Sequence, residues 1–252
     1  MIVTLMTLNI WSLPVGFSQN RYWRLEKIAE EIKKKNPDIV FLQECWLSKD
    51  VRKIARLLEN YSVVLPTTFI NYGGLVVLSK SPFTAQKMNY FRTRAEYSAI
   101  EMLAHKGVIS CQVKSNIPLV FMNTHLYAGC ATKNRSIQKM QVQEMVKIAE
   151  KIPESFCVIM GGDFNLPPEL LMQYTNNHLV SLVHLLDPTF DPRNKYTQRR
   201  GNWLAQPQYR RLDYFATRKG NTHKVQVVKE EYVCKHPPLS DHYGVLLTIK
   251  IT

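Results

Sequence analysis

The feature of this sequence that most constrains its fold is a set of short apolar runs that each end in polar or titratable residues. Five runs have this form: LMTLN, IVFLQE, LVFMNTH, CVIMGGDFN and RRLDY. A short apolar run bounded by polar residues is typical of a strand that is covered on both faces. Segments with the periodicity of amphipathic helices lie between several of these runs, and this alternation predicts an α/β protein.

The segment from Asn20 to Lys35 places apolar residues at i, i+3, i+4 and i+7, the spacing of a helix with one buried face. Pro37 marks the end of this helix. The same spacing predicts two further helices, at Ser48 to Glu59 and at Asn134 to Lys151. Further strands are predicted at Gly74 to Leu78, Val108 to Val113, Leu119 to Met122 and Val245 to Ile251.

The polar ends of the five runs predict a functional site, because open α/β sheets bind ligands at the ends of their strands. The sharpest signal is GGDFNLPP, directly after an apolar run. Its glycines permit a tight turn, and Asp163 and Asn165 can both face one point on a bent chain. The alternative is an ordinary Gly-Asp turn before a helix that starts with proline.

The segment LSDHYG near the C-terminus places His242 beside Asp241. Histidine is the side chain best suited to proton transfer near neutral pH. An Asp-His dipeptide alone has no function in most proteins, so this motif indicates a functional site only together with the other motifs.

The 252 residues contain no linker and no low-complexity segment, so we expect one domain over residues 1–252. The first residues alternate like a strand and lack the features of a secretory signal. No apolar run approaches the roughly 20 residues that a membrane-spanning helix needs. The five cysteines are odd in number and widely spaced, which favours reduced thiols over disulfides or a zinc site. We therefore expect a cytoplasmic monomer.

The formal charge of +13 favours polyanionic partners, either nucleic acid or an anionic membrane surface. Between Phe190 and Lys219, eight basic residues alternate with Tyr196, Trp203, Tyr209, Tyr214 and Phe215. This stretch suits a basic and aromatic wall beside the site, and the alternative is a solvated loop with some core aromatics. The candidate substrate-binding residues are Arg210, Arg211 and Tyr243.

Six motifs in order across the chain, TLNIW, LQECW, NTHLYAG, GGDFN, RRLDY and LSDHYG, resemble the endonuclease/exonuclease/phosphatase superfamily. The local segment LNIWSLP is most similar to the neutral sphingomyelinase-like members. Apurinic endonucleases carry an acid where this chain has Trp11, and the disulfides typical of deoxyribonuclease I are not expected here. The resemblance implies an α/β fold, a four-layered sandwich of two mixed β-sheets packed face to face with helices on the outside.

The resemblance also implies a metal site at one edge of the sandwich. By motif, Glu44 corresponds to the principal ligand of Mg²⁺, with Mn²⁺ as the alternative ion. Asn9 corresponds to a residue at or near the metal, and Asp241 to a further carboxylate on the metal side. Hard cations of this kind prefer carboxylate and amide oxygens, and they neutralise the charge of a phosphodiester.

The catalytic residues implied by the same motifs surround this metal site. Asp163 and Asn165 would position the attacking water and the phosphate. His242 would be the general base or a phosphate contact, oriented by Asp213. His125 resembles the second histidine of the nuclease I and sphingomyelinase branches. The candidates for the carboxylate that orients it are Glu96 and Glu101.

These assignments predict a metal-dependent phosphodiester hydrolase. We keep three hypotheses: a sphingomyelinase-like lipid phosphodiesterase, which we slightly favour, a DNA or RNA nuclease, and a non-catalytic scaffold that only binds. Fold alone does not choose a substrate. The third hypothesis is the weakest, because every aligned catalytic position carries a chemically competent side chain.

Overall fold

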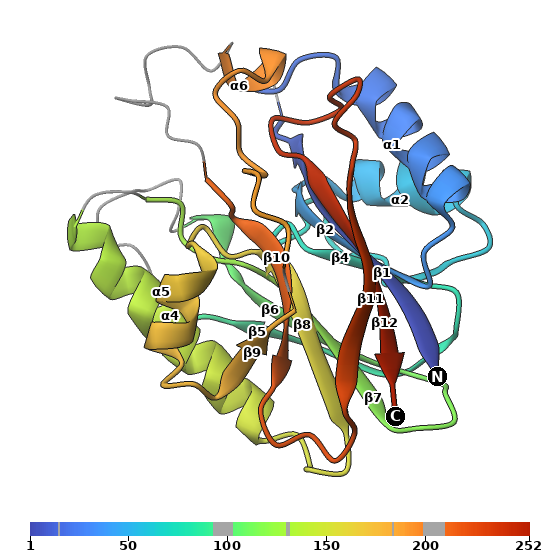
Figure 1. Ribbon diagram of the computed structural model, residues 1–252. Helices are drawn as coiled ribbons and strands as arrows, with labels where there is room; N and C mark the ends of the chain where they lie inside the picture. Colours follow the sequence, from blue (N-terminus) through green and yellow to red (C-terminus); the bar gives the residue numbers. More distant parts are fainter. Residues whose placement is uncertain (15, 93–102, 130–131, 183, 199–209) are drawn as a thin grey trace.

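A computed structural model gives the fold of the chain and describes residues 1–14, 16–92, 103–129, 132–182, 184–198 and 210–252. Two six-stranded mixed sheets pack face to face, and helices cover their outer faces (Figure 1). The predicted four-layered α/β sandwich is confirmed.

The first sheet has the strand order β11-β12-β1-β2-β4-β3. Its strands are β1 (Ile2–Ser12), β2 (Ile39–Cys45), β3 (Ser62–Val63), β4 (Val76–Ser79), β11 (Val225–Val233) and β12 (Gly244–Ile251). The parallel neighbours β1 and β2 are connected by helix α1 (Arg21–Lys35), as a crossover between parallel strands requires. Helix α2 (Ser48–Leu57) follows β2.

The second sheet has the order β5-β6-β7-β8-β10-β9. Its strands are β5 (Phe83–Tyr90), β6 (Gly107–Val113), β7 (Leu119–His125), β8 (Cys157–Asp163), β9 (Leu179–Ser181) and β10 (Asp213–Arg218). Helix α4 (Thr132–Glu150) connects the parallel strands β7 and β8. Two short helices are α5 (Pro168–Tyr174) and α6 (Lys195–Gln198).

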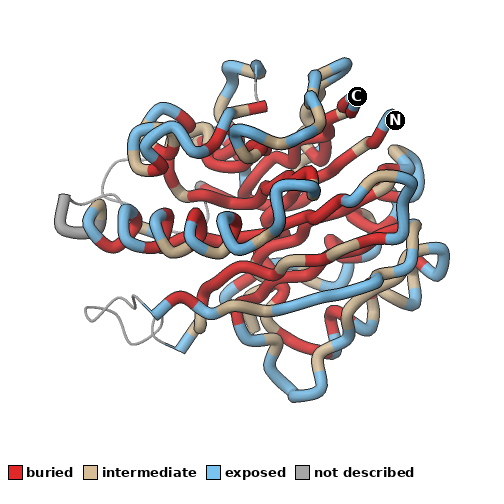
Figure 2. Tube along the Cα trace, turned by 90° about the horizontal axis from the view of Figure 1, so that it is seen from below, coloured by how far each residue is buried: buried red, intermediate tan, exposed pale blue. Residues whose placement is uncertain are grey.

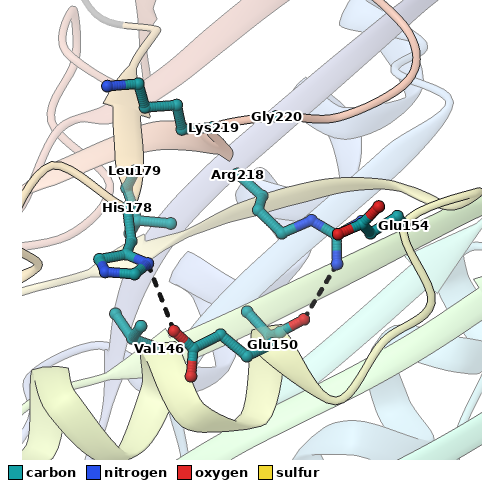
Figure 3. A pocket seen from close by; sticks show the side chains of 9 residues that line it. Val146, Glu150, Glu154, His178, Leu179, Arg218, Lys219 and Gly220 are labelled. Atoms are coloured by element: carbon teal, nitrogen blue, oxygen red, sulfur yellow. Dashed lines mark hydrogen bonds and ion pairs between the residues drawn. The ribbon is translucent and has the colours of Figure 1, made fainter.

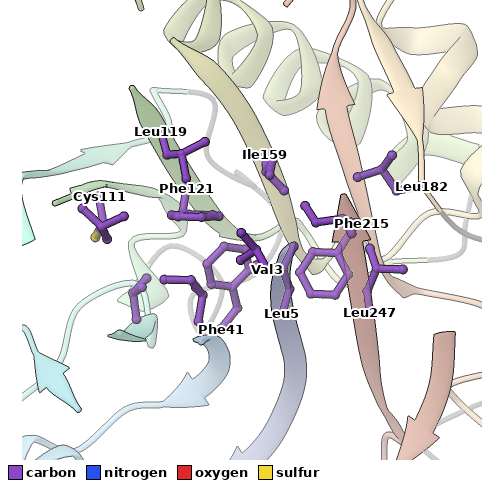
Figure 4. Packing of buried hydrophobic residues seen from close by; sticks show 14 of the residues in the cluster. Val3, Leu5, Phe41, Cys111, Leu119, Phe121, Ile159, Leu182, Phe215 and Leu247 are labelled. Atoms are coloured by element: carbon purple, nitrogen blue, oxygen red, sulfur yellow. The ribbon is translucent and has the colours of Figure 1, made fainter. Parts of the chain in front are cut away.

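The main core lies between the two sheets, where aromatic rings of both interdigitate (Figure 4). Phe41 of β2 contacts Phe121 of β7 at 6.5 Å and Phe215 of β10 at 5.8 Å between ring centroids. All three rings are nearly inaccessible to solvent. Such inward-facing residues alternate with residues that face the outer helices, which explains why the central strands are apolar throughout.

The outer faces of the sheets are buried by amphipathic helices. Leu25, Ile28 and Ile32 of α1 pack on the outer face of the first sheet, and Val142 and Met145 of α4 pack on the second. Figure 2 shows the result from below, with the central strands buried and the solvent-facing sides of the helices exposed. The helical spacing in the sequence therefore identified the buried faces correctly.

Strands β5 and β11 were not predicted from the sequence. Both lie at edges of their sheets, and most of their residues are exposed or only partly buried. Edge strands lack the apolar run that identifies a central strand.

Four cysteines, Cys45, Cys111, Cys157 and Cys234, are free and buried. Burial raises the pKa of Cys111 to about 12 and that of Cys157 to about 11, so both stay as thiols. This confirms the prediction of reduced thiols for these four, and Cys130 lies outside the described residues. None of the helices in the described ranges has the length and apolarity to cross a bilayer.

Candidate active site

The predicted site residues lie where the central strands end. In the second sheet, His125 at the end of β7 is paired in register with Asp163 at the end of β8. Asp213, the first residue of β10, pairs with Asp163 from the other side. In the first sheet, Asn9 pairs with Gln43, the neighbour of Glu44. The strand register therefore brings side chains that are far apart in sequence to one edge of the sandwich.

Asn9 connects the two sheets across this edge. Its Nδ2 donates to Glu44 Oε1 at 3.0 Å and to Asp163 Oδ2 at 2.9 Å, while its Oδ1 accepts from the backbone N–H of Trp11 at 3.0 Å. The side-chain amide of Asn9 therefore bridges the carboxylates of Glu44 and Asp163 and keeps them close together. In this arrangement Asn9 orients Glu44 and Asp163, and its own oxygen faces Trp11.

Asp213 and His242 form a buried pair. His242 Nδ1 lies 2.7 Å from Asp213 Oδ2, and Nε2 lies 3.9 Å from Asp163 Oδ2. Burial opposes the charged imidazolium, but the negative charges of Asp213 and Asp163 outweigh it and raise the pKa of His242 to about 10. The ring of Phe190 lies 5.1 Å from the imidazole ring and covers it. The structure thus keeps His242 protonated at neutral pH.

Asp163 is almost fully buried, and its pKa is raised to about 6. The largest cause is burial, followed by the charge of Asp213, while His242 and the hydrogen bonds from Asn9 and Asn165 oppose the rise. At neutral pH Asp163 is ionised, yet it is a stronger base than an exposed carboxylate.

The two glycines before Asp163 lie inside β8, where close neighbours leave no room for a side chain, so the tight turn expected at them comes only after Asp163. Gly162 has φ +140°, and a Cβ at this position would lie 2.0 Å from the carbonyl oxygen of Thr124. Asn165 follows in the left-handed region, where its backbone N–H donates to Asp163 Oδ1 at 2.9 Å and its Nδ2 donates to Leu126 O at 3.0 Å. Gly162 before Asp163 and Asn165 after it therefore constrain the backbone on both sides and fix the direction of Asp163.

Lys106 is a member of the site to which the sequence analysis gave no role. Its Nζ lies 3.2 Å from His125 Nε2 and donates to Leu126 O at 2.8 Å, and its side chain is buried. A lysine ammonium only donates, so His125 Nε2 accepts and the ring proton lies on Nδ1. His125 Nε2 also lies 3.6 Å from Asp163 Oδ2, which is too long for a hydrogen bond. The signal in the sequence was a lysine two residues before the strand predicted from Val108.

Polar side chains also connect the sheets behind the site. Gln43 Nε2 of β2 donates to Asn123 Oδ1 of β7 at 2.7 Å and to Thr7 Oγ1 at 3.1 Å. Asn123 Nδ2 donates to the carbonyl oxygens of Leu42 and Val76 at 3.0 and 2.9 Å. This buried network fixes the sheets against each other next to Glu44. The sequence gave no signal for it, because it depends on contacts between distant strands.

Asp241 is fully buried behind Asn9. The Ser240 hydroxyl lies 2.6 Å from the carbonyl oxygen of Asn9 and 3.1 Å from Asp241 Oδ1. The guanidinium of Arg24 donates to the carbonyl oxygens of Trp11 and Leu239, so it ties the two rim segments together. Direct metal ligation by Asp241 stays a prediction, and both candidates for orienting His125, Glu96 and Glu101, lie outside the described residues.

The predicted substrate-binding residues have partners within the protein. Arg211 donates to Glu169 at 2.9 Å and to Leu185 O at 2.7 Å. The backbone of Arg210 pairs with that of Phe190. Tyr243 is buried beside Lys235, whose Nζ lies 5.6 Å from its ring centroid. Their role in substrate binding stays a prediction.

The proposed aromatic wall is wrong for three of its members. Tyr196, Tyr214 and Phe215 are nearly inaccessible and belong to the interior. Tyr214 and Phe215 lie in β10, whose two faces are both covered. Trp203 and Tyr209 lie outside the described residues.

A pocket of about 340 Å³ lies at the end of α4, the start of β9 and the end of β10 (Figure 3). His178 Nδ1 pairs with Glu150 there at 3.3 Å. Arg218, which lines the same pocket, donates to four backbone carbonyls around the end of α4. Strand β8 separates this pocket from Asp163, so the pocket is not part of the site.

The ligand atoms of Asp163, Asp213 and His242 lie within 4.8 Å of one another, close enough to share an ion. The hydrogen bond between Asp213 Oδ2 and His242 Nδ1 takes one of these atoms from each residue and leaves Asp213 Oδ1 and His242 Nε2. Mg²⁺ prefers oxygen ligands, which Glu44 offers next to Asp163. In the described part of the chain, Asp213 Oδ1 is buried without a hydrogen-bond partner, which also suits a nearby cation.

A two-sheet α/β sandwich with clustered carboxylates and an Asp–His pair at one edge defines a class of phosphoester hydrolases. The chain belongs to the endonuclease/exonuclease/phosphatase family, which matches residues 6–242. The resemblance expected from the six motifs is confirmed.

Curated relatives act on both lipid and DNA, by their names. A Drosophila melanogaster protein described as a candidate neutral sphingomyelinase is 27% identical over 99% of this chain and 61% of its own length. The inositol phosphosphingolipids phospholipase C of Schizosaccharomyces pombe is 30% identical over 65% of this chain and 41% of its own. A 5'-tyrosyl-DNA phosphodiesterase of Caenorhabditis briggsae is 25% identical over 65% and 45%, respectively. The chain thus spans less than two thirds of these relatives.

A solved structure shows the same fold. The beta toxin of Staphylococcus aureus, as a mutant with bound magnesium ions, superimposes with a TM-score of 0.77 and 18% identity over 98% of this chain and 99% of the toxin chain. At this identity the likeness establishes the fold alone.

Proposed function

We propose that the protein is a magnesium-dependent phosphodiesterase that hydrolyses the headgroup phosphodiester of a sphingolipid. The observation that carries the proposal is the convergence of Asn9, Glu44, Asp163, Asp213 and His242 at one edge of the sandwich. The lipid part of the proposal is supported by similarity to the Drosophila and S. pombe proteins.

Glu44 would hold the magnesium ion, with Asn9 keeping its carboxylate next to that of Asp163. Its oxygen atoms match the ligands that Mg²⁺ prefers, and a sparse protein site suits an ion that retains several waters. When bound, the ion supplies positive charge that stabilises the nonbridging oxygens of the phosphate.

Asp163 and His242 would accept and hold the protons of the reaction. Asp163, with its pKa raised to about 6, is an ionised base that can accept a proton from the attacking water. His242 is held by Asp213 through Nδ1, so Nε2 carries a proton toward the space beside Asp163. Of its two predicted roles, the raised pKa favours phosphate contact over that of a general base.

Asn165 and the pair of His125 and Lys106 would position the substrate. Asn165 is fixed by two hydrogen bonds next to Asp163. The buried ammonium of Lys106 holds His125 and adds positive charge on the side of the site opposite His242. Both features favour binding of a phosphate anion.

The test is a parallel assay of the protein with magnesium and with chelator. The substrates are sphingomyelin vesicles, RNA oligomers, plasmid DNA and a soluble bis-aryl phosphodiester, with His242→Ala as the control. We expect magnesium-dependent turnover of the vesicles and of the soluble ester. Cleavage of nucleic acid without vesicle turnover would favour the second candidate, a nuclease, which the similarity to the C. briggsae enzyme supports. Turnover of none of them would favour the non-catalytic scaffold.

A further inference from the structure

Helix α2 carries a row of basic side chains along its outer face. Lys49, Arg52, Lys53 and Arg56 fall at i, i+3, i+4 and i+7, so they share one side of the helix. The opposite side is buried in the core through residues such as Ile54. We call these four residues the basic stripe.

An exposed aromatic residue of α1, Tyr22, lies along one side of the basic stripe, because α1 and α2 pack next to each other (Figure 1). Tyr22 is 48% exposed. The Nζ atoms of Lys53 and Lys49 lie 5.2 and 5.6 Å from the centroid of the Tyr22 ring. Arg21 lies over the same ring at 4.9 Å, so three cations surround one exposed tyrosine.

The loop before β4 adds apolar side chains on the other side of the stripe. Phe69 is 73% exposed and Ile70 is 42% exposed. The backbone N–H of Ser48 donates to Phe69 O at 3.1 Å, and Leu47 forms a β-bridge with Ile70. These contacts hold the loop against the first turn of α2, where Lys49 lies.

One acidic residue partly offsets this charge. Glu26 of α1 accepts from Lys53 Nζ at 2.6 Å, in an ion pair that is partly exposed. Asp50 of α2 is fully buried and receives the hydroxyl of Ser12, so it does not face solvent with the stripe. Lys49 and Arg52 are both exposed, and they supply positive charge that a partner can reach.

We propose that the basic stripe and the exposed apolar side chains beside it form a surface that binds an anionic lipid bilayer. Cations flanked by exposed aromatic and aliphatic groups match the interface of such a bilayer, with charged headgroups above an apolar interior. Nucleic acid fits less well, because cations lie over the Tyr22 ring and Ile70 has no ring, so that of these side chains Phe69 alone offers an open face for stacking on a base.

The position of this surface connects it to the active site. Helix α2 begins at Ser48, four residues after Glu44, so the first turn of the stripe lies at the end of the first sheet that carries the site. A bilayer bound here would lie near the rim of the active site. The proposal deepens the proposed lipid phosphodiesterase function and rests on it for the substrate, whereas binding itself is measured without hydrolysis.

The experiment is cosedimentation with vesicles in the presence of chelator. Vesicles of phosphatidylcholine alone are compared with vesicles that contain about a third phosphatidylserine, whose negative surface attracts basic residues. The test variant is Lys49→Gln with Arg52→Gln. The matched control is Lys33→Gln with Lys34→Gln, which removes two exposed lysines from the far end of α1 and lowers the net charge equally.

We expect the test variant to bind the anionic vesicles roughly thirtyfold more weakly, from about 1 kcal/mol for each basic residue at the surface. The control should change the affinity by less than about threefold. Phe69→Ser should weaken the binding that remains at high salt, since an apolar contribution is not screened.

Equal losses in the test and control variants, or no loss in either, would overturn the proposal. Tighter binding of a single-stranded RNA through Lys49 and Arg52 would overturn it in favour of nucleic acid. Turnover of the soluble bis-aryl phosphodiester by the test variant reports hydrolysis without a bilayer, so it separates the proposed function from the proposed binding surface. If wild type lacks all turnover while the binding pattern holds, the proposed function fails and the binding surface stands.

Discussion

Replacing Asp213 with asparagine tests the buried pair on which the proposed chemistry depends. The change keeps the size of the side chain and removes the charge that lies 2.7 Å from His242 Nδ1. Asp213 is the first of the charges that raise the pKa of His242 from 6.5 to about 10. Without it the pKa of His242 falls, and the imidazole loses both its charge and its fixed orientation.

We expect kcat/KM of Asp213→Asn on the soluble bis-aryl phosphodiester to fall between about a hundredfold and about ten-thousandfold, as when the partner of a catalytic histidine is neutralised. The alkaline limb of the pH profile should move to lower pH, because the required imidazolium loses its proton earlier. Asp191→Asn is the matched control, since Asp191 is also buried but pairs with Arg193. A loss below about tenfold, or an equal loss in the control, would refute the reasoning.

Four further predictions follow from the same geometry. Asp163→Ala and His242→Ala should each lower kcat by more than about a hundredfold while far-UV circular dichroism stays unchanged, and activity above a few per cent in either would refute the assigned roles. The acid limb of the kcat/KM profile should lie near pH 6, where Asp163 takes up a proton, and a limb near pH 4 would argue for another base. Because the pKa of His242 is raised in the folded protein, the protonated His242 contributes stability that is complete below pH 6.5 and is lost as the pH rises toward about 10. The free energy of unfolding in urea, measured against pH, should therefore fall over this range in wild type and not in His242→Gln. Parallel curves for the two proteins would contradict this prediction. Gly162→Ala should lower the free energy of unfolding by about 1 to 3 kcal/mol in urea denaturation, because its Cβ would meet Thr124 O, and an unchanged midpoint would contradict the close approach of the two strands.

The sequence predicted the central strands well because their burial on both faces leaves a mark in the composition. The runs that end in Glu44, His125 and Asp163 became β2, β7 and β8, and the polar residue at each end lies in the site. His125 and Asp163 meet because β7 and β8 are parallel neighbours, whereas Glu44 comes from the other sheet, and the resemblance to a known family supplied the expectation that both sheets meet at one site.

The rest of the site depends on contacts between distant segments, which leave no local pattern. Lys106 reaches His125 across neighbouring strands, and Gln43 reaches Asn123 across the two sheets. Edge strands such as β5 carry too little apolar character to be recognised. Tyr214 was wrongly predicted to belong to the aromatic wall, because an aromatic residue that is near basic residues in the sequence can still face the core.

The central claim is that side chains from both sheets surround a single divalent cation, and anomalous scattering from crystals soaked in Mn²⁺ tests it most directly. We predict one strong peak at about 2.2 Å from a carboxylate oxygen of Glu44, and its loss in Glu44→Gln. A peak bound elsewhere, or an unchanged peak in Glu44→Gln crystals, would contradict the account.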